Sequence, residues 1–252
     1  MWENISFKKC EAFLSYHFYA KNKETAYIRP AITISRAEGA GGHTVASELA
    51  NYLHEKTYTH SEWTVFDKNL VEKVIEEYNH QKRIAEFMEE GHKSMIVDAF
   101  EELIGLHPST WKLIEQTNVT ILNLAKKGNV IIVGRGANII TKSLENAFSV
   151  RLVGTFEKRV KQIQKVYNMN EEDAINYVKK EDEAKSRYIK DNFGEDINNP
   201  LLYHLIINTD LISHEEAARL IGDAVIKRFK LDVPEKRTYK KEVTFVNKEV
   251  RL

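Results

Sequence analysis

The feature that most restricts the fold is a short apolar run followed by a glycine-rich turn and a helix. Residues 31–34 read Ala-Ile-Thr-Ile, which is typical of a strand buried on both faces. Three glycines follow within four positions, Gly39, Gly41 and Gly42. Apolar side chains then recur at the four-residue spacing of a helix, at Val45, Leu49 and Leu53. The pattern predicts the strand–turn–helix unit from which α/β proteins are built.

The rest of the chain repeats this alternation of strand and helix. Four further apolar runs predict strands, at residues 63–66, 130–133, 148–153 and 205–207. Helical patterns fall between or after them, over residues 70–78, 81–110 (less regular), 110–127, 155–168, 170–190 and 213–226. Strands separated by helices require right-handed crossovers, so we expect an α/β fold with a five-stranded parallel sheet.

Local signals mark several helix ends. Gly128 is a typical C-terminal cap, and Thr155 is placed to cap the helix after the fourth strand. Asn170 with Asp173 resembles a capping pair, and Ser213 with Glu216 forms a capping box. Outside these elements, residues 1–28 predict an appended helix that packs on the core or forms a subunit contact, and residues 233–252 a charged tail.

Composition narrows the function classes. The 252 residues contain 37 Lys and Arg and 37 Asp and Glu, a balance that argues against a general nucleic-acid binder. The single cysteine, Cys10, excludes an internal disulfide, and no apolar run approaches the roughly 18 residues of a membrane span. We therefore expect a cytoplasmic protein with no nucleic acid and no membrane as partner. No zinc-type histidine motif or nucleophile elbow occurs in the sequence.

The glycine turn has the chemistry of a phosphate site. Backbone N–H groups at a helix start are unpaired, the helix dipole favours negative charge there, and glycine lets the backbone curl round a phosphate. We predict that ATP phosphates bind at Gly39, Ala40, Gly41, Gly42, His43 and Thr44. Thr44 also offers a hydroxyl to a hydrated metal ion. The alternatives are an ordinary glycine-rich turn and, for His43, a solvent-exposed histidine.

The loop lacks the lysine of the usual P-loop motif. When Gly41 is set on the second glycine of G-x-x-x-x-G-K-[ST], Gly42 stands where lysine belongs. A P-loop lysine neutralises the transferred phosphates, so phosphoryl transfer here needs another cation. Arg36, at the end of the first strand, is the nearest candidate.

Two more polar residues follow predicted strands at the edge where open α/β sheets bind ligands. Arg135 lies between two glycines directly after residues 130–133, and its alternative role is a surface turn. Asp67 follows residues 63–66 and equally suits an N-cap for the next helix.

Several segments together resemble the cytidylate kinase-like family, divergent relatives of the P-loop nucleoside monophosphate kinases. The resemblance spans about residues 30–230 and rests on four motifs, residues 32–46, Phe66-Asp67-Lys68, residues 130–137 and residues 202–209. It implies a P-loop kinase-like three-layer fold over residues 29–232, with an acceptor region near 67–128 and a lid near 155–200. It also implies transfer of a phosphoryl group from ATP, with Mg²⁺, to a nucleoside monophosphate such as CMP or dCMP.

The resemblance carries over to single residues. Gly39, Gly41 and Thr44 match the phosphate loop, and Asp67 and Arg135 match acceptor-binding positions. Arg159 matches an arginine in the helix after the fourth strand, and Arg187 a lid arginine. Together with Arg36 they are the predicted catalytic cations, and Thr44 is the predicted metal-binding residue. Three departures stand out: Gly42 for the loop lysine, Gly136 for an aspartate that recognises the acceptor, and an irregular spacing between Asp182 and Arg187.

Three hypotheses follow. The first is a nucleotide-dependent phosphotransferase whose partner is a small-molecule nucleotide. The second, motivated by Gly42 and Gly136, is a non-catalytic nucleotide-binding regulatory module. The third is a scaffold in which residues 1–28 recruit a partner or a second copy, giving a homo-oligomer.

Overall fold

The computed structural model describes residues 29–57, 63–67 and 109–231. The expected appended helix, the charged tail and the helices expected between residues 70 and 108 lie outside the described residues.

The core is a five-stranded, all-parallel sheet. Its strands are β1 (Ala31–Arg36), β2 (Thr64–Phe66), β3 (Val130–Val133), β4 (Ala147–Val153) and β5 (Leu205–Asn208). They are arranged in the order β2-β3-β1-β4-β5, so β1 is central. The predicted α/β fold with a five-stranded parallel sheet is confirmed, with strand ends within two residues of those expected.

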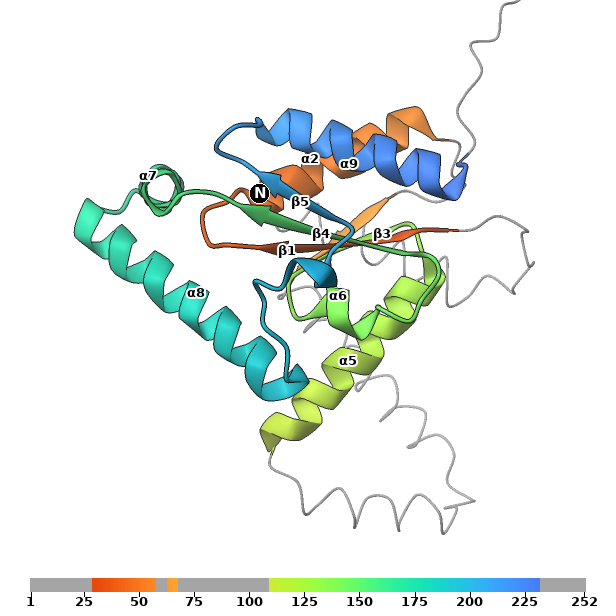
Figure 1. The fold of residues 1–252 in the computed structure, drawn as a ribbon, viewed down its shortest axis with the longest axis horizontal. Coiled ribbons are helices and arrows are strands. Elements are labelled where there is room, and N and C mark those ends of the chain that lie inside the picture. The colour runs from red at the N-terminus through yellow and green to blue at the C-terminus, as the bar shows by residue number, and fades with distance from the viewer. Residues whose placement is uncertain (1–28, 58–62, 68–108, 232–252) are drawn as a thin grey trace, which may run out of the picture.

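Helices cover both faces of this sheet, as Figure 1 shows. On one face lie α2 (Gly42–Lys56) and α9 (His214–Phe229), and on the other lie α5 (Ser109–Lys127) and the short α6 (Ala137–Ile140). Alternate residues of β1 supply the two layers: Ile32 and Ile34 pack with Leu49 and Ile221, whereas Ala31 packs on the other side among a cluster of Phe66, Ile121 and Ile132. The strand β1 is apolar on both faces because each face packs against a layer of helices.

Two helices, α7 (Phe156–Tyr167) and α8 (Glu171–Phe193), extend beyond the carboxyl edge of the sheet (Figure 1). They pack on each other through a small cluster of their own, Val160, Ile163, Ala174 and Val178. A 3₁₀ turn, η1 (Pro200–Leu202), leads the chain back to β5. These elements occupy the residues for which the sequence predicts a lid.

The predicted caps fall where the sequence places them, with one difference. The Asn170 side chain accepts the Asp173 N–H at 2.8 Å, and Ser213 and Glu216 form the reciprocal capping box. Thr155 is the N-cap residue of α7, but its side chain makes no capping bond; Asp210 accepts the Thr155 N–H at 2.8 Å instead. The loop after β5 therefore anchors the start of α7. None of the helices in the described part of the chain is both long and apolar enough to cross a bilayer.

We expect Leu49→Ala to lower the free energy of unfolding by about 2–5 kcal/mol, because a fully buried leucine leaves a cavity between α2 and the sheet. The measurement is urea unfolding followed by circular dichroism. Leu220→Ala on α9, where the side chain is 49% exposed, is the matched control and should change stability by less than about 1 kcal/mol. Equal losses in the two variants would contradict the assigned core.

Candidate phosphate-binding site

The glycine loop between β1 and α2 is shaped by two left-handed residues, Gly39 (φ 82°) and Gly41 (φ 78°). Both are packed so closely that no side chain fits. A Cβ at position 39 would lie 2.5 Å from the backbone oxygen of Arg159, and one at position 41 would lie 2.1 Å from Nε2 of His214. The loop is thus held between the starts of α7 and α9, which requires glycine at these two positions.

The backbone amides at the start of α2 are open. The first helical hydrogen bond runs from the Val45 N–H to the Gly41 oxygen at 2.9 Å. The N–H groups of Gly42, His43 and Thr44 donate to no acceptor among the described residues. Free amides at the positive end of a 15-residue helix form the arrangement that binds phosphate and other anions.

Arg36 fills the space beside this loop. A Cβ at position 42 would lie 2.9 Å from its Cγ, and a Cβ at Gly134 would lie 2.1 Å from its Nη1. The side chain therefore passes across Gly42, and its guanidinium rests on Gly134 at the end of β3. Burial lowers the pKa of Arg36, whereas the nearby acids Glu38, Asp67 and Glu181 raise it. Arginine remains charged at neutral pH, so a cation stands where the sequence lacks the loop lysine.

A second group of charges ties α8 to the loop. Asp182 accepts the Glu38 N–H at 2.7 Å and a hydrogen bond from Arg159 Nη1 at 2.6 Å. Arg159 also donates to the backbone oxygens of Glu38 and Gly154, at 2.8 and 3.1 Å. Lys185, one turn after Asp182, forms an ion pair with the Glu38 carboxylate. The Asp182 carboxylate of α8 thus already accepts the Glu38 N–H of the loop.

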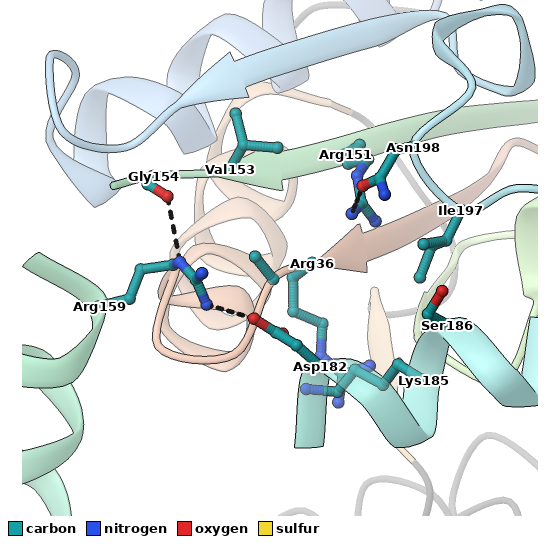
Figure 2. A pocket seen from close by; sticks show the side chains of 11 residues that line it. Arg36, Arg151, Val153, Gly154, Arg159, Asp182, Lys185, Ser186, Ile197 and Asn198 are labelled. Carbon is teal, nitrogen blue, oxygen red and sulfur yellow. Dashed lines mark hydrogen bonds and ion pairs between the residues drawn. The ribbon is translucent and has the colours of Figure 1, made fainter. Parts of the chain in front are cut away.

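These side chains surround a cavity of about 280 Å³ at the carboxyl ends of β1 and β4 (Figure 2). Its charged and polar lining residues come from both strands, α7, α8 and the segment before η1: Arg36, Arg151, Arg159, Asp182, Lys185, Ser186 and Asn198. Four cations and one carboxylate line the cavity, and this excess of positive charge favours an anion as its ligand.

The remaining predicted acceptor residues lie at the same edge of the sheet. Asp67 directly follows β2, with its Oδ2 3.8 Å from Nδ1 of His43. Arg135 has a left-handed backbone (φ 55°), and its guanidinium carbon lies 5.9 Å from the ring centre of Tyr188 on α8. A Cβ at Gly136 would lie 2.6 Å from Cε2 of Phe193. A side chain at position 136, where the backbone is left-handed (φ 67°), would therefore collide with α8.

Comparison with known proteins agrees with this architecture. The cytidylate kinase-like family matches residues 31–211, most of the chain. The chain belongs to this family. Two curated relatives are a cytidylate kinase of Pyrococcus horikoshii, 28% identical over 134 residues, and one of Thermococcus kodakarensis, 28% identical over 116 residues. The matched segments cover 53% and 46% of this chain and 67% and 57% of those relatives.

Two solved structures are similar to the chain at lower sequence identity. An uncharacterised protein from Eubacterium ventriosum superposes with a TM-score of 0.57 and 18% identity, covering 78% of this chain and 98% of that one. A shikimate kinase from Bacteroides thetaiotaomicron gives a TM-score of 0.43 and 15% identity, covering 80% and 99% of the two chains. The first of these likenesses supports the fold.

Within this member of the cytidylate kinase-like family, the structure brings most predicted residues to one edge but not Arg187. Its side chain is 65% exposed and pairs with Glu183 on the same helix. Lys185 lies in the cavity instead. Sequence reasoning missed Lys185 because the surrounding helix is rich in charges, although its i,i+3 spacing from Asp182 places both on one face. It also missed the role of Glu38.

The residues near the loop fit a nucleotide-bound magnesium ion. Such an ion keeps several waters and phosphate oxygens and needs only one or two protein ligands. The Thr44 hydroxyl, in the first turn of α2, has no hydrogen-bond partner among the described residues, and the Asp67 carboxylate lies at the same edge. The described ranges hold no group of three or more His, Cys, Asp or Glu side chains that would bind a metal without phosphate.

The histidines test whether the loop takes an anion. Burial lowers the pKa of His43 below 6.5, and Arg36 lowers it further; burial likewise lowers the pKa of His204, at the start of β5. Both rings should therefore titrate below 6.5. At lower pH the unfolded chain binds protons more readily than the folded protein does. The contribution of each histidine to the free energy of unfolding should thus be complete above pH 6.5 and decline as the pH falls through that value. NMR titration of the ring protons measures both midpoints.

Sulfate should raise the His43 midpoint, because an anion at the adjacent amides stabilises the imidazolium, and should leave His204 unchanged. Equal responses of the two histidines to sulfate would count against an anion at the loop.

Proposed function

We propose that this protein is a phosphotransferase that moves the γ-phosphoryl group of ATP to a nucleoside monophosphate such as CMP or dCMP. The observation that carries the proposal is the set of open amides of residues 42–44 beside the Arg36 side chain. Family membership and the cytidylate kinase names of the two curated relatives support the reaction type.

The donor nucleotide would lie with its phosphates on the loop. The N–H groups of Gly42, His43 and Thr44 would donate to phosphate oxygens, and Arg36 would supply the positive charge that a loop lysine gives in other P-loop enzymes. Thr44 and Asp67 would hold the magnesium ion, whose chemistry when bound is to neutralise charge on the phosphates.

The transfer itself needs positioning and charge neutralisation more than covalent chemistry. Arg36, Arg159 and Lys185 lie around one cavity and would stabilise the charge of the transferred group. The packing of α8 above the cavity would exclude water, which otherwise competes as acceptor. Asp67 and Arg135, on the β2 and β3 side, would orient the acceptor.

One observation favours the second candidate, a nucleotide-binding regulator without transfer. The Asp182 carboxylate already occupies the Glu38 amide and one Nη of Arg159. If this contact persists when nucleotide binds, Arg159 would be unavailable to the phosphates, and the protein would bind nucleotide without turnover.

The direct test is ADP formation from ATP and Mg²⁺ with CMP, dCMP and UMP. We expect turnover with at least one acceptor, and roughly a 100-fold or greater loss of kcat in Arg36→Ala, because a cation that stabilises developing charge is removed. Arg219→Ala, which removes an exposed arginine paired with Glu215, should retain full activity. Absence of turnover with every acceptor, together with a rise in Tm on adding ATP, would favour the regulator.

A double-mutant cycle tests whether Arg36 replaces the loop lysine. Gly42→Lys in the unmodified protein should lower kcat/KM, because the new side chain meets Arg36 Cγ. In Arg36→Ala the same change should raise kcat/KM, since the lysine enters vacated space and restores a cation. Equal losses in both backgrounds would show that the two side chains do not share one position.

A further inference from the structure

The cavity holds a buried arginine that the proposed donor site does not use. Arg151 lies on β4 paired in register with Ser35 of β1, so both side chains lie on the same face of the sheet. It is 6% exposed and donates to Ser35 Oγ and Asn198 Oδ1, each at 2.9 Å. Its guanidinium carbon lies 5.7 Å from the centre of the Tyr203 ring.

All these partners of Arg151 are neutral. No carboxylate of the described chain lies within ion-pair distance of it, and two N–H bonds leave three of its five donors for other acceptors. A buried charge is costly unless it is paired. Arg151 is therefore a buried cation that has no negatively charged partner among the described residues.

Two of the other three cations of the cavity differ in this respect. Arg159 is paired with Asp182, and Lys185 with Glu38. Arg36, labelled beside the same cavity in Figure 2, has nearby acids but makes no hydrogen bond or ion pair within the described residues. Two cations, Arg36 and Arg151, thus enter the cavity without a directly bonded counter-charge.

We propose that Arg151 is the floor of an anion subsite that binds a phosphate dianion between itself and Arg36, separate from the loop amides of residues 42–44. Two charges from the neighbouring strands β1 and β4 match a phosphomonoester better than a monovalent anion, and the arginine fork suits phosphate oxygens. The volume of about 280 Å³ is several times that of one water in the liquid, about 30 Å³. The phosphate would belong either to the acceptor or to the group that is transferred, and this assignment rests on the proposed function.

A purely structural arginine would behave differently. Arg151 also links β1, β4 and the segment before η1, so its loss as a structural link would lower stability whether or not phosphate is present. As an anion ligand its removal relieves an uncompensated buried charge, so the ligand-free protein should keep or gain stability while phosphate binding is lost.

The probe is inorganic phosphate, measured by calorimetric titration and by its effect on Tm. We expect the unmodified protein to bind phosphate and Arg151→Met to bind it at least about tenfold more weakly, with an equal or higher Tm in phosphate-free buffer. Arg219→Met is the matched control and should match the unmodified protein in both measurements. If Arg151→Met fails to fold, Arg151→Lys, which keeps the charge but loses the fork, should still bind phosphate more weakly.

Unchanged phosphate affinity in the Arg151 variant that folds would overturn the subsite, since binding would then occur at the loop amides or the surface. So would absence of phosphate binding by the unmodified protein.

Competition identifies the source of the phosphate. Displacement of phosphate by CMP assigns the subsite to the acceptor, whereas displacement by ATP and Mg²⁺ but not by CMP assigns it to the transferred group. If neither nucleotide competes, its place in the transfer site is overturned. The two proposals also fail separately: Arg151-dependent phosphate binding without kinase turnover removes only the kinase, and normal turnover in Arg151→Met removes only the subsite.

Discussion

The site depends on a constraint at the junction of β1 and α2. The sheet buries β1 between two neighbours, so its last residues must leave the core and turn back at once into a helix that covers one face. Two left-handed glycines make that turn possible, and they are pressed against Arg159 and His214, so the turn cannot relax. The amides of residues 42–44 are left without an acceptor among the described residues because the helix has no earlier carbonyl to accept them.

The absence of the loop lysine has a physical explanation in this geometry. A side chain at position 42 and the Arg36 side chain compete for one volume, and a side chain at 134 would compete for the place of the guanidinium. Gly42 and Gly134 therefore leave the space that the Arg36 side chain occupies. The residue that carries the charge then comes from the end of β1 and not from the start of α2, and its side chain passes across Gly42.

The strands and capped helices could be predicted from sequence because their signals are local. The runs at 31–34 and 130–133 are apolar on both faces, and the box of Ser213 and Glu216 lies within one turn. The candidate site is assembled from the ends of all strands but β5 together with α2, α7 and α8, and local patterns do not say which face of α8 turns inward. Arg187 and Lys185 differ by two residues, a rotation of about 200° on a helix, so one faces solvent and the other the loop.

Charge balance connects the loop, α8 and the cavity. Asp182 pairs with Arg159 and Glu38 pairs with Lys185, and these contacts hold α8 close to the loop. Neither carboxylate is left to pair with Arg151. Another carboxylate in the cavity could pair with Arg151, but it would then repel a phosphate ligand from the same position. A site that must accept a dianion and release it needs cations held in place by neutral groups, and Ser35 and Asn198 hold Arg151 in that way. The neutral partners are thus what leaves its charge available to a ligand.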